Sequence, residues 1–263
     1  MPPANPHAAF VVPPQLANLE RFHRDALAQL FGASPPGTAI DGTRHFLFIC
    51  FTNRCGSNYL AHLLASTGRL NEAGEFFNAP TVTAHVRERR LPSLGAYVNF
   101  LSNRLDMNGW LVAKLGIEQL VMLTEARILD QIRNRTHFIL IERRDRVAQA
   151  VSRLVAEQNY QWTSQQAARI PDDRLVYARE AITLHAASVE AQNFMFLRFF
   201  ASNGIAPLHF AYEAVVADPQ RALTEIGATL GIGALVSDPA RIGIAPQDSP
   251  LKRAWYARYK AGG

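Results

Sequence analysis

Lysine is the scarcest charged residue of this chain, although the chain as a whole is basic. Of its 27 lysine and arginine residues, only Lys114, Lys252 and Lys260 are lysines. Arginine therefore carries most of the positive charge, and its planar guanidinium suits bidentate binding of oxyanions. Nucleic-acid-binding proteins are basic too, but the sequence has no zinc-finger, homeodomain or RNP motif. We therefore expect an oxyanion as ligand, and no nucleic acid as partner.

Cysteine and long apolar runs are also scarce. Cys50 and Cys55 are the two cysteines, and with no other cysteine to pair with them we expect a reducing compartment, the cytoplasm. No Cys/His cluster has the spacing of metal ligands, so we expect no metal. No apolar run reaches the roughly 18–20 residues that cross a bilayer. The first 25 residues lack the basic and then apolar segments of a signal peptide, so we expect none.

Short apolar runs alternate with amphipathic segments along the chain. Four continuous apolar runs predict buried parallel strands; they lie at 44–51, 109–116, 136–144 and 206–213. Six segments with helical spacing predict helices; they lie at 16–31, 57–68, 117–134, 145–158, 172–203 and 218–232. This alternation predicts an α/β fold, with a mainly parallel sheet and helices on both faces.

The predicted elements also suggest how the chain is divided. We expect residues 1–43 to form an N-terminal extension with one helix, and residues 44–263 to form a single domain. The N-terminal helix is amphipathic and the surface rich in arginine, which predicts either contact with an anionic membrane or packing on the domain or a second subunit.

A short polar turn, Arg-Cys-Gly-Ser-Asn, joins the first predicted strand to the helix after it. The backbone N–H groups at a helix start carry partial positive charge and bind phosphate or sulfate oxygens. Gly56 lets the backbone approach an anion, Ser57 and Asn58 can donate hydrogen bonds, and Arg54 adds a full charge. The same turn is also compatible with an ordinary helix start capped by Ser57.

Two other phosphate-binding loops do not fit this turn. The Walker loop requires a lysine before its final serine or threonine, and the turn contains no lysine. A cysteine phosphatase needs an arginine six residues after its nucleophile, where this chain has Ala61. We therefore expect Cys55 to be a small loop residue rather than a nucleophile.

A second pattern follows the third predicted strand. Arg143 and Arg144 stand at the end of the strand, and Ser152 follows eight or nine residues later, two turns into the next helix. An arginine and a serine at this separation match the pair with which sulfotransferases hold the 3′-phosphate of 3′-phosphoadenylyl sulfate (PAPS). The alternative is that both arginines are surface charges and Ser152 a small packing residue.

Several segments, in order, resemble the bacterial carbohydrate sulfotransferases typified by trehalose 2-sulfotransferase. They are FTNRCGSNYLAHLLASTG, NEAGEFFN, NGWLVAKLGIEQL, ERRDRVAQAVSRLVAEQNYQW and LHFAYEAVVADP. The resemblance covers roughly residues 45–260. Cys55 and Asn58 depart from it, because the family usually has Ser and Thr there. The segment between residues 77 and 108 is shorter than in trehalose 2-sulfotransferase, so the resemblance does not identify the acceptor.

The resemblance implies a P-loop-like three-layer fold and a set of partners. PAPS would be the donor, adenosine 3′,5′-bisphosphate the product, and a hydroxyl of a sugar, glycolipid or lipopolysaccharide the acceptor, with no metal required. A homodimer would be consistent with the trehalose enzyme. Two other functions stay open on the residues alone: a catalytically silent nucleotide-binding protein of the same fold, and a small-molecule kinase.

The resemblance also implies roles for single residues. Residues 54–58 would hold the 5′-phosphosulfate, and Glu75, flanked by phenylalanines that shield it from water, matches the carboxylate assigned as general base. Lys114 would contact the sulfuryl group or the acceptor, with a strand-end salt bridge as the alternative. Trp162 would line the site, and the basic tail with Lys252, Arg253 and Arg258 would close over the nucleotide.

Overall fold

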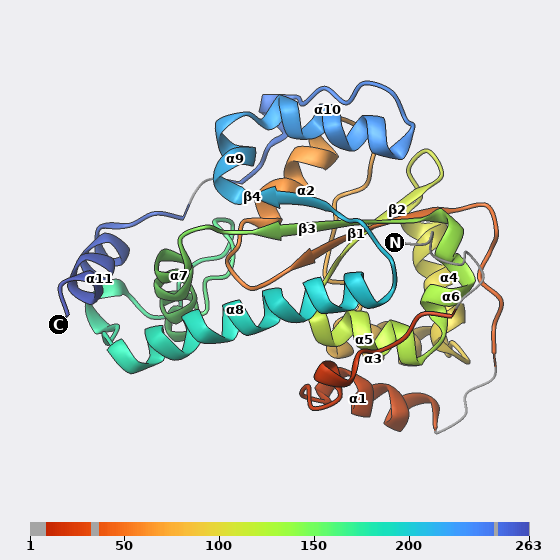
Figure 1. Ribbon diagram of the computed structural model, residues 1–263, viewed down its shortest axis with the longest axis horizontal. Helices are drawn as coiled ribbons and strands as arrows, with labels where there is room; N and C mark the ends of the chain where they lie inside the picture. Colours follow the sequence, from red (N-terminus) through yellow and green to blue (C-terminus); the bar gives the residue numbers. More distant parts are fainter. Residues whose placement is uncertain (1–8, 33–36, 245–246, 263) are drawn as a thin grey trace.

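The computed structural model describes residues 9–32, 37–244 and 247–262. A parallel sheet of four strands in the order β2–β1–β3–β4 forms its centre (Figure 1). The strands are β1 (His45–Phe51), β2 (Trp110–Leu115), β3 (Thr136–Glu142) and β4 (Leu208–Ala211). Each lies inside one of the four apolar runs, so the predicted strands and their parallel arrangement are confirmed.

The strand side chains alternate between two buried apolar layers. In β1, Phe46 and Phe48 belong to one cluster, and Leu47 and Ile49 belong to the other. Successive residues of a strand point to opposite faces of the sheet, so a continuous apolar run needs helices on both faces. The three-layer α/β fold predicted from this pattern is confirmed.

Helices cover both faces of the sheet (Figure 1). One face carries α2 (Ser57–Ser66), α9 (Tyr212–Ala217) and α10 (Pro219–Leu230). The other carries α3 (Ala79–Arg89), α4 (Leu94–Leu105), α5 (Ile117–Glu125), α6 (Ile128–Ile132) and α8 (Arg179–Ser202). A third cluster joins α8 to α7 (Arg146–Asn159) and α11 (Pro250–Lys260), so α11 is held beside α7.

Two helices begin later in the chain than predicted. The segment 16–31 is α-helical only as α1 (Phe22–Phe31), and Leu16 ends the short 3₁₀-helix η1 (Pro14–Leu16). The α-helix begins late because the buried guanidinium of Arg24 occupies the carbonyls of Leu19 and Glu20. The segment 172–203 becomes α-helical only from α8 onward. There the backbone N–H and C=O of Val176 pair with the Gln158 side chain and keep the preceding stretch irregular.

The prediction also missed an interruption and several helices. The segment 117–134 is divided between α5 and α6 at Arg127, whose φ is 59°. Sequence patterns assigned no element to α3, α4 or α9, and described α11 only as a basic, aromatic tail. The other predicted helices, over 57–68, 145–158 and 218–232, correspond to α2, α7 and α10.

The N-terminal segment packs on the body of the protein. Phe10 and Leu16 are buried in the apolar cluster that contains Phe46 and Phe48 of β1. Helix α1 contacts α3 and α5. Of the two arrangements expected for this helix, the structure shows the packed one. Among the described helices, none is both long and apolar enough to cross a membrane.

Candidate functional site

The loop after β1 turns sharply because two of its residues adopt left-handed backbone conformations. Arg54 has a φ of 68° and Gly56 a φ of 95°. The ring of Tyr212 lies against Gly56, so that a Cβ built at residue 56 would be 2.1 Å from Tyr212 Cδ2. Glycine is therefore required at this position for two reasons, the backbone angle and the space.

Helix α2 begins at this loop without a side-chain cap. Gly56 is its N-cap and Ser57 its first helical residue, so the alternative in which Ser57 caps the helix is wrong. The first N–H groups of a helix have no partners inside the helix and bind anions readily. The N–H of Cys55, by contrast, donates to the Thr52 carbonyl at 3.2 Å inside the turn.

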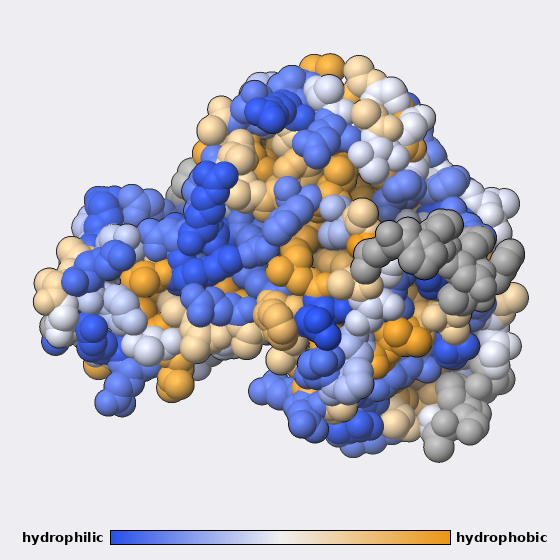
Figure 2. All heavy atoms as spheres, viewed as in Figure 1, coloured by the Kyte–Doolittle hydropathy of each residue, from blue (hydrophilic) through white to orange (hydrophobic). Residues whose placement is uncertain are grey.

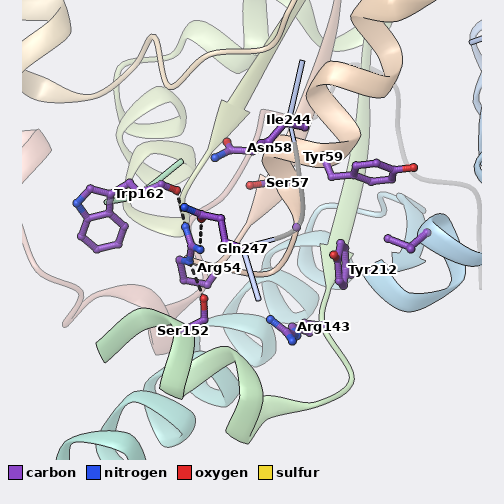
Figure 3. A pocket seen from close by; sticks show the side chains of 12 residues that line it. Arg54, Ser57, Asn58, Tyr59, Arg143, Ser152, Trp162, Tyr212, Ile244 and Gln247 are labelled. Atoms are coloured by element: carbon purple, nitrogen blue, oxygen red, sulfur yellow. Dashed lines mark hydrogen bonds between the residues drawn. The ribbon is translucent and has the colours of Figure 1, made fainter. Parts of the chain in front are cut away.

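The loop opens into a cavity of about 260 Å³ at the carboxyl ends of the strands (Figure 3). Its walls come from segments far apart in the sequence; they include Arg54, Gly56, Ser57, Asn58, Arg143, Ser152, Trp162, Tyr212 and Gln247. A second cavity, of about 500 Å³, shares Arg143, Ser152 and Tyr212 with the first and extends to Lys252 and Arg253 on α11. The structure therefore brings together the loop, Arg143 and Ser152, and Lys252 and Arg253 of the tail.

Arg54 lies where these segments meet. Its Nε donates to Ser152 Oγ at 3.0 Å, and its terminal nitrogens donate to the Trp162 carbonyl and the Gln247 side chain (Figure 3). Burial, and then the charge of Arg143, lower the pKa of Arg54 to about 10, so it stays positively charged at neutral pH. One guanidinium thus connects the loop to α7 and to the chain before α11.

Arg143 and Arg144 differ in what they face. Arg143 lines both cavities, and its buried Nε has no hydrogen-bond partner within the part of the chain that the structure describes. Arg144 does not line either cavity, and its backbone N–H donates to the Glu213 carboxylate at 3.1 Å. Arg143 is therefore the one that shares a cavity with Ser152, whose hydroxyl accepts from Arg54 and still has its own hydrogen to donate.

Lys114 connects the loop to Glu75. Its buried Nζ lies 2.5 Å from Asn58 Oδ1 and 3.3 Å from Glu75 Oε1, so the strand-end salt bridge considered for Lys114 is present. A cavity of about 430 Å³ is lined by Lys114 and Glu75 and also by Arg54, Ser57 and Asn58. Glu75 therefore lies beside the loop, next to its charged residues.

The segment that carries Glu75 is attached to the edge of β2. The Asn71 side chain pairs with both the N–H and the C=O of Val112, at 2.7 and 2.9 Å. The Lys114 N–H donates to the Gly74 carbonyl at 2.8 Å. The Phe76 ring packs over Gly74, where a Cβ would lie 2.5 Å from it. These contacts fix the backbone before Glu75, and the Tyr97 hydroxyl, which donates to the Phe76 carbonyl at 2.6 Å, fixes it after Glu75.

Cys55 is fully buried in the loop. Burial raises the pKa of its thiol, which keeps it protonated and therefore a poor nucleophile. Within the described parts of the chain, no three His, Cys, Asp or Glu side chains are grouped so that they could hold a metal ion.

Sequence patterns missed several residues of this site. Gln247 and the Trp162 carbonyl hold Arg54, yet no motif pointed to either role, because both partners are distant in sequence. Tyr59 lines the first cavity and its ring meets that of Tyr212 edge-on, with 6.4 Å between the centroids. Of the basic tail, Lys252 and Arg253 line the second cavity, whereas Arg258 lies over the ring of Tyr177.

Comparison with known proteins adds one match. Residues 109–262 match the family model described as Stf0 sulphotransferase, and no curated protein is similar enough to count as a match. The matched part includes Lys114, Arg143 and Ser152, whereas Glu75 and the loop after β1 precede it. Because the match covers more than half of the chain, the protein belongs to the Stf0 sulphotransferase family.

Proposed function

We propose that this sulfotransferase takes its sulfuryl group from PAPS and transfers it to a hydroxyl of a sugar, glycolipid or lipopolysaccharide. One observation carries the proposal: an uncapped helix start, two arginines and a lysine converge on connected cavities that end at a carboxylate. Such a site suits a donor with several phosphate and sulfate oxygens and an acceptor that must lose a proton.

On this proposal, the two cavities beside Arg143 hold the nucleotide. Arg143 and Ser152 bind the 3′-phosphate. The buried Nε of Arg143 has no partner among the described residues, and a buried donor without a partner is costly until a ligand oxygen satisfies it. Arg54 and the N–H groups of residues 56–58 hold the 5′-phosphosulfate. Lys252 and Arg253 lie at the far wall and add positive charge, while Arg144 has no direct role.

Lys114 and Glu75 perform the transfer. When the sulfuryl group enters beside Asn58, the Lys114 ammonium binds its oxygens and leaves its ion pair with Glu75. The freed carboxylate takes the proton of the acceptor hydroxyl as that oxygen forms a bond to sulfur. The bond from sulfur to the bridging oxygen breaks in line, and adenosine 3′,5′-bisphosphate leaves. Arg54 and Lys114 stabilise the charge that develops, a contribution on the order of 3 kcal/mol for each well-placed donor.

Calorimetric titration with adenosine 3′,5′-bisphosphate, beside AMP, tests the donor site. We expect tight binding that requires the 3′-phosphate and weakens roughly 10- to 100-fold in Arg143→Ala, as the loss of a charge-assisted hydrogen bond predicts. Ser152→Ala should weaken it less. Arg144→Ala is the matched control and should bind like the wild type. Equal affinity for AMP and the bisphosphate would refute PAPS as donor.

A second variant tests the base. Glu75→Gln keeps the size and polarity of the side chain but cannot take a proton, so we expect turnover to fall by about 10²- to 10⁴-fold while the bisphosphate still binds. Normal turnover in this variant would exclude Glu75 as the base. Bisphosphate binding without transfer to any acceptor would instead favour a silent nucleotide-binding protein.

A further inference from the structure

A third cavity, of about 500 Å³, lies on the other side of Glu75 from the loop. Glu75, Phe51 and Asn53 line both this cavity and the one that contains Lys114, so the two are continuous at the carboxylate. Its remaining walls come from residues 18–23, Asn78 before α3, the start of α5, Arg153 on α7 and the middle of α8. Figure 2 shows the surface indented between the part carrying α8 and the part carrying α1.

The side chains around this cavity are mostly uncharged and polar or acidic. Amide, hydroxyl and carboxylate groups are contributed by Asn18, Asn78, Gln119, Ser188, Gln192, Glu20 and Glu118. Amides and hydroxyls both donate and accept hydrogen bonds, which matches the many hydroxyls of a sugar. Arg153 on α7 also lines the cavity, but its Nε donates to the Glu157 carboxylate at 2.7 Å. The carboxylates of Glu20, Glu75 and Glu118 therefore outnumber it and disfavour a second anion here, unlike in the nucleotide cavities.

His23 on α1 is held in this wall with one ring nitrogen already occupied. Its Nδ1 accepts from the Ala79 N–H at 3.0 Å, so the neutral ring carries its hydrogen on Nε2. Burial lowers the pKa of His23, although the nearby Glu118 and Glu75 carboxylates oppose this effect, and the ring is therefore neutral near pH 7. The His23 side chain is 14% exposed, which leaves little freedom for the ring to turn.

The Nε2–H of His23 has no protein acceptor at hydrogen-bond distance among the described residues. Glu118 Oε2 lies 3.8 Å away, beyond that distance. The Gln119 amide nitrogen lies 3.4 Å away, but it carries hydrogens itself, since Gln119 Oε1 accepts from the Gly116 N–H at 2.5 Å. A buried donor without an acceptor is costly, and a ligand oxygen in the cavity would satisfy it.

We propose that His23 Nε2, in the wall of this cavity, donates a hydrogen bond to an oxygen of a neutral sugar acceptor beside Glu75. A hydroxyl that accepts from His23 and donates to Glu75 is oriented for proton loss. The inference rests on the proposed function, in which Glu75 is the base. It assigns a substrate-binding role to α1, which lies outside the residues matched by the family model.

Two substitutions of His23 test the roles of its two ring nitrogens separately. His23→Asn places an oxygen near the position of Nδ1, so it keeps an acceptor for the Ala79 N–H but loses the donor into the cavity. His23→Gln places an amide N–H near the position of Nε2, so it keeps the donor but loses the contact that fixes the start of α3. Arg21→Ala is the matched control, because Arg21 lies two residues before His23 and its side chain is exposed.

The readouts are urea unfolding, calorimetric binding of the bisphosphate, and transfer of labelled sulfate from PAPS to glucose, galactose, maltose and trehalose. We expect His23→Asn to unfold like the wild type and to raise the KM for the sugar about 5- to 10-fold, the loss of one hydrogen bond. Its kcat should also fall, because the hydroxyl beside Glu75 is less well oriented. We expect His23→Gln to keep that KM but to unfold at lower urea. Arg21→Ala should match the wild type in all three assays.

Each other result counts against one part of the argument. A normal sugar KM in His23→Asn, with only His23→Gln impaired, would make His23 purely structural and overturn the inference. Bisphosphate binding by a wild type that sulfates none of these sugars would overturn the neutral-sugar assignment while leaving the donor site intact. A wild type that does not bind the bisphosphate would overturn the proposed function and, with it, this inference.

Discussion

Substituting Gly56 with alanine perturbs the candidate site at the position with least room. The added Cβ would lie 2.1 Å from Tyr212 Cδ2, and 2.7 and 2.8 Å from two further atoms of that ring. The φ of 95° at Gly56 would also have to be adopted by a residue with a side chain. Tyr212 lies across the cavity from Arg54 and beside Arg143 (Figure 3), so moving its ring changes the site itself.

Two separate effects lower the free energy of unfolding in Gly56→Ala. A non-glycine residue in an unfavourable left-handed conformation costs about 1–3 kcal/mol, and forcing an extra carbon into packed surroundings costs about 1–3 kcal/mol. Gly109→Ala provides the control for the first part, because Gly109 has a φ of 81° and open space around its missing Cβ. We therefore expect Gly56→Ala to lower the free energy of unfolding by roughly 2–6 kcal/mol, and Gly109→Ala by the smaller, backbone part alone.

Urea unfolding of both variants measures these costs, and bisphosphate titration measures their effect on the site. Gly56→Ala should weaken bisphosphate binding at least about tenfold, which corresponds to 1.4 kcal/mol, whereas Gly109→Ala should bind normally. The double variant Gly56→Ala/Tyr212→Ala removes the overlapping ring and should cost less than the sum of the two single variants. If Gly56→Ala is no less stable than Gly109→Ala, the contact with Tyr212 does not constrain the loop and the reasoning fails.

Two further predictions concern ionisable groups near the loop. Burial, and then the charge of Arg54, lower the pKa of Lys252 to about 8, so Lys252 loses its charge as the pH rises through 8. The affinity for the bisphosphate, measured by calorimetry, should therefore fall between pH 7 and 9. Lys252→Arg, which stays charged over this range, should make the affinity depend less on pH. Burial raises the pKa of the Cys55 thiol, so iodoacetamide at neutral pH should not inactivate the native protein. Cys55→Ala should keep turnover within a few-fold, in contrast to the large loss expected for Glu75→Gln.

The parts of the fold that are local in sequence were predictable, and those set by distant contacts were not. The four strands and the loop follow from apolar runs and one polar turn. The late start of α1 depends instead on Arg24 occupying two backbone carbonyls, and the late start of α8 on a side chain 18 residues earlier. Neither contact leaves a periodic signal in the sequence.

The same distinction explains what was predicted of the site. The pattern of two adjacent arginines followed by a serine located the region but did not distinguish Arg143 from Arg144. The structure separates them because β3 ends at Glu142 and Glu213, from the start of α9, takes the N–H of Arg144. His23 has no motif around it, and its place beside Glu118 and Ala79 depends on how α1 packs against α3 and α5.

The charged residues that line the connected cavities change in sign from one end of the site to the other. At one end three cations, Arg143, Lys252 and Arg253, outnumber the two carboxylates of Asp145 and Asp248. Arg54 and Lys114 line the middle. At the other end the three carboxylates of Glu20, Glu75 and Glu118 outnumber Arg153. Opposite charges at the two ends orient a ligand that is strongly negative at one end only. On the proposed function, PAPS then enters with its phosphates toward α11, and its sulfuryl group stops at Lys114 because the carboxylates beyond repel it. A neutral acceptor has no such penalty, so the charge pattern that binds the donor also keeps the acceptor cavity free for a sugar hydroxyl.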